Sequence, residues 1–162
     1  LLQDPVNKRS YYGHLNDIIA TSYNATYMAP WCAQLGALLP GQNFTSHCSF
    51  LDDRSAYVLS GSSASVLSTF PSVGFQITTE GGDDFTVDTR ETTLQGDAWV
   101  DVRHITLNGA SESLDLTWLD DTTWQVTIAL AEGDNDIGLT ATDLHGATVG
   151  RDAIVVTADL AR

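Results

Sequence analysis

The chain has few basic residues. Its 162 residues include 21 aspartates and glutamates but only 7 lysines and arginines, and the formal net charge is −14 at pH 7. Nucleic acids and anionic membranes are bound by basic surfaces that release counterions, so this charge excludes both as expected partners. Salt weakens the self-repulsion of an acidic surface. The charge therefore fits a saline or extracellular setting, and it also fits the ordinary variation among acidic proteins.

Long apolar runs and a basic leader are missing as well. No stretch approaches the roughly 20 consecutive apolar residues that a helix needs to cross a bilayer, so we expect no membrane insertion. The chain begins LLQDP, without Met and without a basic n-region. We expect any signal peptide to lie upstream, either in a precursor or in a larger protein.

Motifs of enzymes and cofactor sites are absent from the sequence, which contains no nucleophile elbow, P-loop, HExxH or GxGxxG. The 4 histidines are isolated from one another, which favours surface or half-buried positions over metal ligation. We therefore predict that the chain is not an enzyme and has no cofactor.

Only two cysteines occur, Cys32 and Cys48. Their spacing fits a small closed loop and no CxxC metal or redox pattern. In an exported chain we predict a disulfide, which would stabilise the fold by about 3 kcal/mol for a loop of this length. In a reducing compartment we would expect two buried thiols instead.

Aspartates cluster in EGDNDIGLTATDLHG, residues 132–146. Calcium is bound by several oxygen ligands, often from one compact acidic loop, and Asp134 and Asp136 offer two. The EF-hand spacing is not met, and we favour a turn in which both carboxylates stay solvated, with calcium as the alternative. Asp143 is predicted to accept backbone N–H bonds in a turn that Gly146 completes with positive φ.

The first part of the chain has the periodicity of helices. Asp4-Pro5 is a good N-cap and first-turn pair, and the apolar residues that follow predict a helix over 5–22. The pattern breaks at Asn24-Ala25-Thr26. Pro30 is then expected to open a second helix that ends at Pro40-Gly41.

A third helix is expected to begin after a Ser46 cap, and the serine-rich SGSSAS at 60–65 is expected to end the helical region. These positions put Cys32 on the second helix and Cys48 at the start of the third. A bridge between the two cysteines would pin the 40–46 loop.

After Pro71 the apolar residues alternate with polar ones, in short runs separated by turn-forming residues. This pattern indicates an antiparallel sandwich rather than alternating strands and helices. Asn108-Gly109 is the strongest hairpin signal, since a tight turn needs positive φ at both central residues. The runs are 73–77, 85–87, 100–107, 114–118, 124–128, 137–141 and 154–156.

Three tryptophans of this part could form a platform for sugars. Trp118 and Trp124 share the phase of their apolar neighbours and are predicted to point inward, whereas Trp99 is out of phase with Val100 and Val102. Trp99 is therefore the candidate ligand-binding aromatic. Two N-glycosylation sequons begin at Asn24 and Asn43, both in predicted helix breaks, with chance occurrence as the alternative.

The second half resembles a bacterial immunoglobulin-like module of secreted and surface proteins. The resemblance covers about residues 92–157 and rests on LQG (94–96), VDVRHITLNG (100–109), TTWQVTIALAEGDNDIGLTATDLHG (122–146) and AIVVT (153–157). It implies a fold and no particular activity, because such modules have many functions. The expected fold class is thus α+β by segments, with a three-helix segment over 1–68 and an Ig-like antiparallel sandwich of seven to eight strands over 72–162.

Residues from about 5 to 60 also resemble the helical tail that follows the catalytic core in CotH-like protein kinases. The residues concerned are RSYYGHLNDII (9–19) and FLDDRSAYV (50–58). The nucleotide-binding and catalytic segments of such a kinase have no counterpart in this chain. No catalytic residue is therefore carried over.

These observations favour a secreted or cell-surface structural module of a larger protein or assembly. Expected partners are further copies or neighbouring modules, and the bolder form is a filament built by pairing of sheet edges or of the terminal strand 152–158. The alternatives are a carbohydrate-binding module of a secreted enzyme, with a polysaccharide partner, and the accessory tail of a CotH-like kinase.

Overall fold

The structure is a computed structural model of the chain, and it describes residues 2–59, 70 and 72–160. Within these residues three α-helices precede eight strands in two sheets, which confirms the predicted α+β arrangement. Internal contacts divide the chain into Leu1–Ser10 with Ser72–Arg162, here called the sandwich unit, and Tyr11–Pro71, the helical unit. The first ten residues thus group with the sandwich, whereas the sequence-based boundary placed all of 1–68 together. The expected helix end at 60–65 lies outside the described residues.

Helix α1 (Pro5–Thr21) begins where the sequence predicts. The Asp4 carboxylate accepts the backbone N–H of Asn7 at 3.0 Å. Such a cap satisfies a donor that has no partner within the first turn of a helix. The predicted N-cap is therefore confirmed.

Helix α2 (Ala25–Leu38) begins earlier than predicted, because Asn24 starts the helix instead of breaking the pattern. Its side-chain oxygen accepts the N–H of Tyr27 at 2.9 Å, and its amide nitrogen donates to the Ile19 carbonyl at 2.9 Å, at the end of α1. One asparagine thus serves both helix ends. Pro30 lies inside α2 and does not open it, since its fixed φ is compatible with a helix at the cost of one hydrogen bond.

Helix α3 (Phe44–Leu59) also starts before its predicted cap. The Asn43 side-chain oxygen accepts the N–H of Ser46 at 3.0 Å, so Asn43 is the capping residue and Ser46 lies in the first turn. Asparagine caps helices at least as well as serine, which explains why the earlier residue is used.

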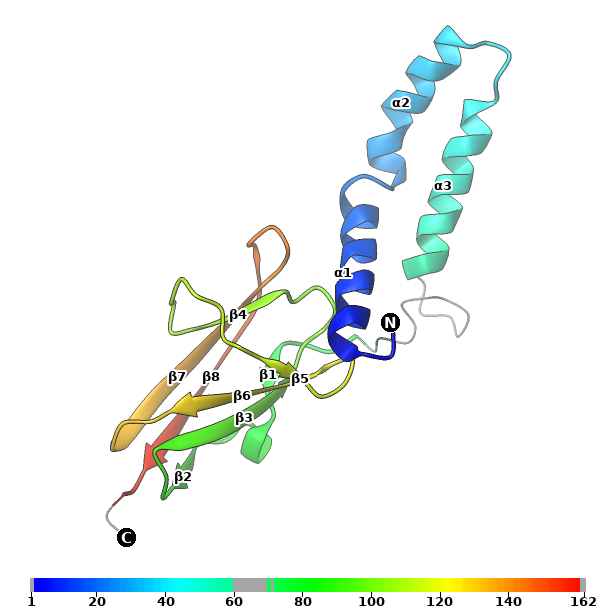
Figure 1. The fold of residues 1–162 in the computed structure, drawn as a ribbon. Coiled ribbons are helices and arrows are strands. Elements are labelled where there is room, and N and C mark those ends of the chain that lie inside the picture. Colours follow the sequence, from blue (N-terminus) through cyan, green and yellow to red (C-terminus); the bar gives the residue numbers. More distant parts are fainter. Residues whose placement is uncertain (1, 60–69, 71, 161–162) are drawn as a thin grey trace. The chain divides into compact units, whose positions relative to one another are not determined.

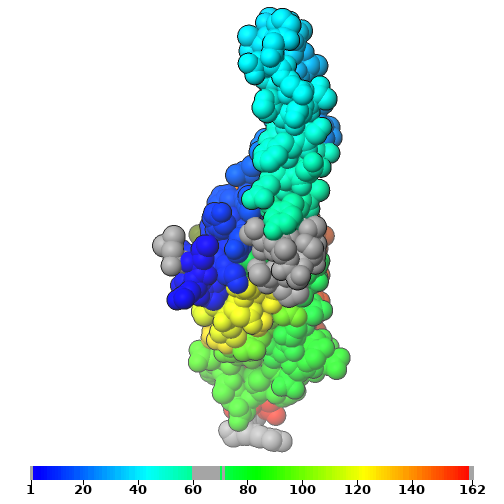
Figure 2. Space-filling model, turned by 90° about the vertical axis from the view of Figure 1, so that its right-hand side faces the viewer, coloured from blue at the N-terminus to red at the C-terminus, as the bar shows by residue number. Residues whose placement is uncertain are grey.

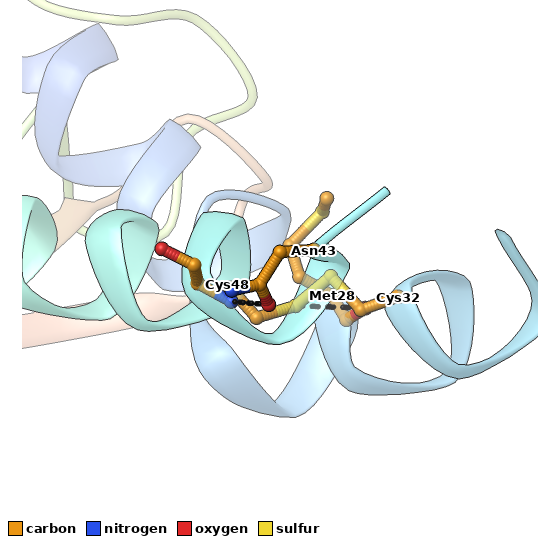
Figure 3. The surroundings of a disulfide bond; sticks show 5 residues. Met28, Cys32, Asn43 and Cys48 are labelled. Atoms are coloured by element: carbon orange, nitrogen blue, oxygen red, sulfur yellow. Dashed lines mark hydrogen bonds between the residues drawn. A yellow bond between two sulfur atoms is a disulfide. The ribbon is translucent and has the colours of Figure 1, made fainter. Parts of the chain in front are cut away.

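The antiparallel helices α2 and α3 form a hairpin, and a disulfide joins them (Figure 3). Cys32 on α2 and Cys48 on α3 have Cα atoms 6.5 Å apart, which confirms the predicted bridge. Along α2 the half-buried residues Met28, Cys32 and Gly36 recur every fourth position, so they share one face. The bridge closes the loop between the two helices. Figure 2 shows this hairpin from the α3 side, with α3 in cyan.

The strands form two four-stranded layers (Figure 1). The only parallel neighbours in the named ladders of the described residues are β2 and β8, so the sandwich is mixed rather than wholly antiparallel. One sheet has the order β1 (Gln76–Ile77), β3 (Glu91–Asp97), β6 (Thr123–Ala129), β5 (Thr117–Trp118), and the other β2 (Phe85–Val87), β8 (Thr148–Ala158), β7 (Gly133–Thr142), β4 (His104–Leu107).

The core lies between the two sheets, where alternate residues of the long inner strands point inward. Trp124 of β6 is fully buried, as predicted, and stacks on Phe75 with ring centroids 5.9 Å apart. Its ring lies against Gly96 of the neighbouring strand β3. A Cβ at Gly96 would stand only 2.2 Å from the Trp124 ring and from the Gln76 carbonyl oxygen, so this position requires glycine.

The run at 100–107 departs from its prediction. Strand β4 starts only at His104, whereas Val100 and Val102 are buried in a turn. Asn108 and Gly109 adopt positive φ of 48° and 75°, which confirms the predicted turn. The chain after this turn makes a single bridge back to β4 and then joins the opposite sheet as β5, so no full hairpin forms.

Candidate functional site

Arg9 is the most unusual polar residue of the sandwich unit, because its side chain is only 3% exposed. Its guanidinium donates to the Ala98 carbonyl at 2.9 Å, to the Trp99 carbonyl at 2.5 Å and to the Asp121 carbonyl at 2.5 Å. These acceptors belong to the turns that follow β3 and β5. Backbone groups in turns lack ladder partners and need donors when buried. Arg9 therefore explains why 98–103 can be buried without being a strand.

The Arg9 guanidinium also lies 3.5 Å from the centroid of the Trp118 ring. Cation–π attraction adds to the hydrogen bonds here, because the ring face is electron-rich. Burial lowers the pKa of Arg9 to about 10, with the charge of Asp101 opposing this effect. The side chain is thus still a cation at neutral pH, held by carbonyl oxygens and one aromatic face. Lys8 beside it forms an ion pair with Asp121.

Asp101 and Asp120 sit in nearby turns and have shifted pKa values in opposite directions. Burial raises the pKa of Asp101 above its ordinary value, with backbone N–H groups and Arg9 acting against the shift. The N–H groups of Thr122 and Thr123 donate to Asp120 at 2.8 and 2.7 Å and lower its pKa. Both carboxylates therefore interact with backbone groups of their own turns.

The predicted inward orientation of the two later tryptophans agrees with the structure to different extents. Trp124 is fully buried, and Trp118 is half-buried under Arg9. Trp99, the candidate ligand-binding aromatic, is half-buried, and its indole nitrogen is shielded from solvent without a hydrogen-bond partner. An exposed, flat sugar platform requires open ring faces. Arg9 covers one face of the Trp118 ring, and ligand binding by Trp99 stays a prediction.

Asp134 and Asp136 lie on strand β7 and not in a turn, which corrects the predicted loop. Both are exposed at alternate positions, so they occupy one face of an extended strand. The Asp134 carboxylate accepts the hydroxyl of Thr157 on β8 at 2.6 Å. Among the described residues no three histidines, cysteines or carboxylates converge on a point that could hold a metal ion. Calcium at these two residues stays the alternative to the favoured solvated carboxylates.

Asn135 and Asp143 support turns of the sandwich. The Asn135 side chain accepts the Ala131 N–H at 2.8 Å and donates to the Ala131 carbonyl at 2.9 Å. The Asp143 carboxylate accepts the N–H groups of His145 and Ala147 at 2.9 and 2.8 Å, and Gly146 has φ of 81°. The predicted Asp143 turn is therefore confirmed.

The outer edge of β8 is closed in part by carboxylates. Asp84 accepts the Val155 N–H of β8 at 2.8 Å, and Asp152 of β8 accepts the Ile77 N–H at 2.6 Å. Strand β2 covers the last residues of β8, and β7 pairs along the other side. Each strand at a sheet edge, β1, β2, β4 and β5, has only 2 to 4 residues. Short and charged edges oppose pairing with another chain.

The two sequon asparagines have different surroundings. The amide nitrogen of Asn24 donates to the carbonyls of Ile19 and Ala20, at 2.9 and 3.2 Å. Asn43 is exposed and accepts from Ser46 through its oxygen. A glycan is attached to the amide nitrogen, so a glycan on Asn24 would compete with a helix-ending contact. Glycosylation at either residue stays a prediction.

An apolar stripe on α2 completes the set of candidate surfaces. Tyr27, Trp31, Leu35 and Leu38 are 47%, 49%, 40% and 74% exposed and follow one another at helical spacing. An open groove of the helical unit, lined by Tyr27, Trp31 and Ala56 among others, runs beside this stripe. The spacing of Trp31, Leu35 and Leu38 in the sequence is that of one helix face, but spacing does not show whether such a face is covered. Arg9 was missed altogether, because an isolated arginine in a helical pattern carries no sign of distant carbonyl partners.

No family model and no curated protein matches the chain. Among solved structures it is similar to the fibronectin(III)-like modules of Clostridium thermocellum CbhA, with 13% sequence identity and a TM-score of 0.36. The match covers 52% of this chain and 95% of that one. A similarity this distant says nothing of activity. No helix among the described residues has the length and apolar character needed to cross a membrane.

Proposed function

We propose that the chain is a non-enzymatic structural module of a larger secreted or cell-surface protein. The disulfide between Cys32 and Cys48 carries the proposal. Disulfides of this kind persist in oxidising compartments and are rare where glutathione keeps thiols reduced. The helical hairpin buries little apolar surface, so the disulfide is needed to hold its two helices together.

The polar side chains of the sandwich support the structural role. Arg9, Asp120, Asn135 and Asp143 each bind backbone groups of turns. Side chains engaged in this way fix geometry and are not available to a substrate. The sandwich is therefore suited to hold a fixed spacing between neighbouring parts of a protein.

Filament growth by strand pairing has a specific obstacle. Residues 152–158 lie within β8, between β7 on one side and β2 and Asp84 on the other. No continuous row of open backbone groups remains on this segment for a second chain. If the module assembles, we expect assembly through side chains of the helical unit.

Fractionation of the source cells tests the proposal. The chain is expected at the cell surface or in the medium, with both cysteines protected from iodoacetamide until a reductant is added. Peptide mass spectrometry reads out the labelling, and a Cys32→Ser, Cys48→Ser variant controls for disulfide-dependent export. A cytoplasmic chain with two freely alkylated thiols would refute the extracellular function.

A further inference from the structure

Helix α2 has an unusual surface for a helix of a water-exposed hairpin. Its 14 residues, ATYMAPWCAQLGAL, include no charged side chain and no buried residue. Surface helices normally keep apolar residues on the packed face and charged residues on the other. Here the apolar stripe Tyr27, Trp31, Leu35 and Leu38 lies about a quarter of a turn around the helix from the side that approaches α3. Tyr27 and Trp31 also line a groove together with Asp52 and Ala56 of α3. Each of the four side chains of the stripe is nevertheless at least 40% exposed.

The distribution of charge indicates the kind of partner. Residues 18–51 contain no Asp, Glu, Lys or Arg. The helical unit carries three aspartates and one arginine, hence −2, which leaves −12 of the total −14 for the sandwich unit. A strongly charged partner of either sign gains no attraction from an uncharged stripe. Two copies of this acidic chain, however, can meet at the stripe, because its four residues carry no charge. Asp52 in the groove beside it is a carboxylate at the Tyr27 end, which an antiparallel contact keeps apart from the same end of the second copy.

The stripe is also self-complementary in an antiparallel arrangement. Tyr27 and Leu38 lie at its ends and Trp31 and Leu35 in its middle, over about 17 Å at 1.5 Å per residue. When one stripe is turned by 180° onto another, the Tyr27 end meets the Leu38 end and Trp31 meets Leu35. The groove beside the stripe, with small residues such as Ala25 and Ala56, offers space for the rings. Such an isologous contact closes after two copies.

Other routes of self-association are less available in the described residues. The edge strands of both sheets are short, and Asp84 closes part of the β8 edge. The sandwich unit carries most of the negative charge, which opposes contact between two sandwich surfaces. The disulfide holds the α2–α3 hairpin before association, so less conformational entropy is lost on binding.

We propose that two copies of the chain associate through this stripe, with α2 packed antiparallel against α2 of the second copy. The two hairpins then form a four-helix arrangement in which Trp31 and Leu35 are the central side chains. This inference gives a partner to the proposed structural module and rests on that function for its setting only. Cell fractionation and thiol labelling test the proposed extracellular function. The mass of the purified chain in solution tests the dimer independently.

Sedimentation equilibrium of the intact, oxidised chain is the decisive experiment. The wild type is expected to show a dimer mass that depends on concentration, with tighter association in 0.5 M than in about 0.05 M NaCl, because salt screens the acidic units. Trp31→Glu with Leu35→Glu is expected to raise the dissociation constant at least tenfold. Leu119→Glu is the matched control, since Leu119 is equally exposed, at 47%, on the sandwich unit, and it should leave the mass unchanged.

Circular dichroism and thiol titration verify that each variant is folded and oxidised, and Trp31→Ala gives a milder variant if the double change unfolds α2. A wild type that remains monomeric at several hundred micromolar in high salt would overturn the proposal. So would a double variant that still dimerises. Binding of the monomer to neutral phosphatidylcholine vesicles, lost in Trp31→Ala, would assign the stripe to a lipid surface instead.

Discussion

The sandwich and the helical hairpin are stabilised in different ways. The sandwich has fully buried side chains such as Leu94, Ile105 and Trp124. In the hairpin, α2 has no buried residue, and α3 buries only Ser55 and Val58. Caps at Asn24 and Asn43 and one disulfide replace the missing core. The sandwich is therefore stabilised mainly by buried apolar side chains. The hairpin depends instead on helix caps and a disulfide, and it leaves apolar side chains exposed.

The core tryptophan gives the largest expected effect and tests the first half of this contrast. Trp124→Ala should lower the free energy of unfolding of the sandwich by about 3 to 5 kcal/mol, because a fully buried aromatic side chain is removed. Urea denaturation followed by near-ultraviolet circular dichroism measures the loss. Leu119→Ala is the control at an exposed apolar residue of the same unit. Equal midpoints for Trp124→Ala and the wild type would show that the sandwich does not depend on its core.

Removal of the disulfide tests whether the helical hairpin depends on this bond for its stability. The Cys32→Ser, Cys48→Ser variant should lose about 3 kcal/mol, and the loss should appear in the helical signal at 222 nm. Reduction of the wild type with dithiothreitol should give the same midpoint as the variant. If the helical signal of the variant melts with that of the oxidised wild type, the hairpin has another source of stability.

Arg9 tests a further source of stability in the sandwich, because this buried cation donates hydrogen bonds to backbone carbonyls. Arg9→Met keeps the aliphatic bulk but removes all donors, and it should destabilise the sandwich by about 2 to 3 kcal/mol, since buried carbonyls are left without partners. Arg90→Met is the control at an exposed arginine. Thermal melting in the near ultraviolet measures both variants, and equal melting temperatures would contradict the assigned role.

A pH series should reveal a smaller effect in the turns around Arg9. Burial raises the pKa of Asp101, so its neutral form favours the folded state, and this contribution is lost as the pH rises through the folded-state pKa. Asp101→Asn should therefore raise the melting temperature at about pH 7 more than at about pH 4.

The pKa of Asp120 is shifted in the opposite direction to that of Asp101, so Asp120 serves as the control for this pH series. Backbone N–H groups lower its pKa, so its contribution is present above the unfolded-state pKa and is lost as the pH falls through the folded-state pKa. Asp120→Asn should lower the melting temperature at about pH 7. Shifts of the same sign in both variants would argue against these assignments.

The smallest effect is expected from calcium. Asp134→Asn with Asp136→Asn should change the free energy of unfolding by no more than about 0.5 kcal/mol, as is usual for exposed positions. Millimolar calcium should leave the melting temperature of the wild type unchanged. A calcium-dependent increase that disappears in the double variant would restore the metal-site alternative.

Local patterns predicted the features that are decided locally. Asn108-Gly109 adopts the expected positive φ, Asp143 binds its own turn, and Trp124 points inward in phase with its strand. The disulfide also followed from a simple count and spacing. In each case the residues that decide the structure lie close together in the sequence, or belong to one alternating run.

The features that could not be predicted depend on partners far away in the chain. The turn at 98–103 looks like a strand by alternation, and Arg9, which is distant in the sequence, donates to its Ala98 and Trp99 carbonyls and so supports burial in another conformation. The stripe of α2 has the spacing of a packed face, and spacing cannot tell whether a neighbour is present. Asn24 is ambiguous for a different reason, because asparagine is common both where helices end and where they begin.

The position of Arg9 has a consequence for how this protein can be dissected. Residues 1–10 belong to the sandwich unit. In the sequence, the helical unit is therefore inserted between Ser10 and Ser72 and does not simply precede the sandwich unit. A fragment that starts at Ser72 would contain every strand, yet it would lack the guanidinium that binds the turn at 98–103. During synthesis Arg9 can make these contacts only after residues 98–121, which contain its partners, have been made. Residues 1–10 and 72–162 thus form one unit, although the helical unit separates them in the sequence.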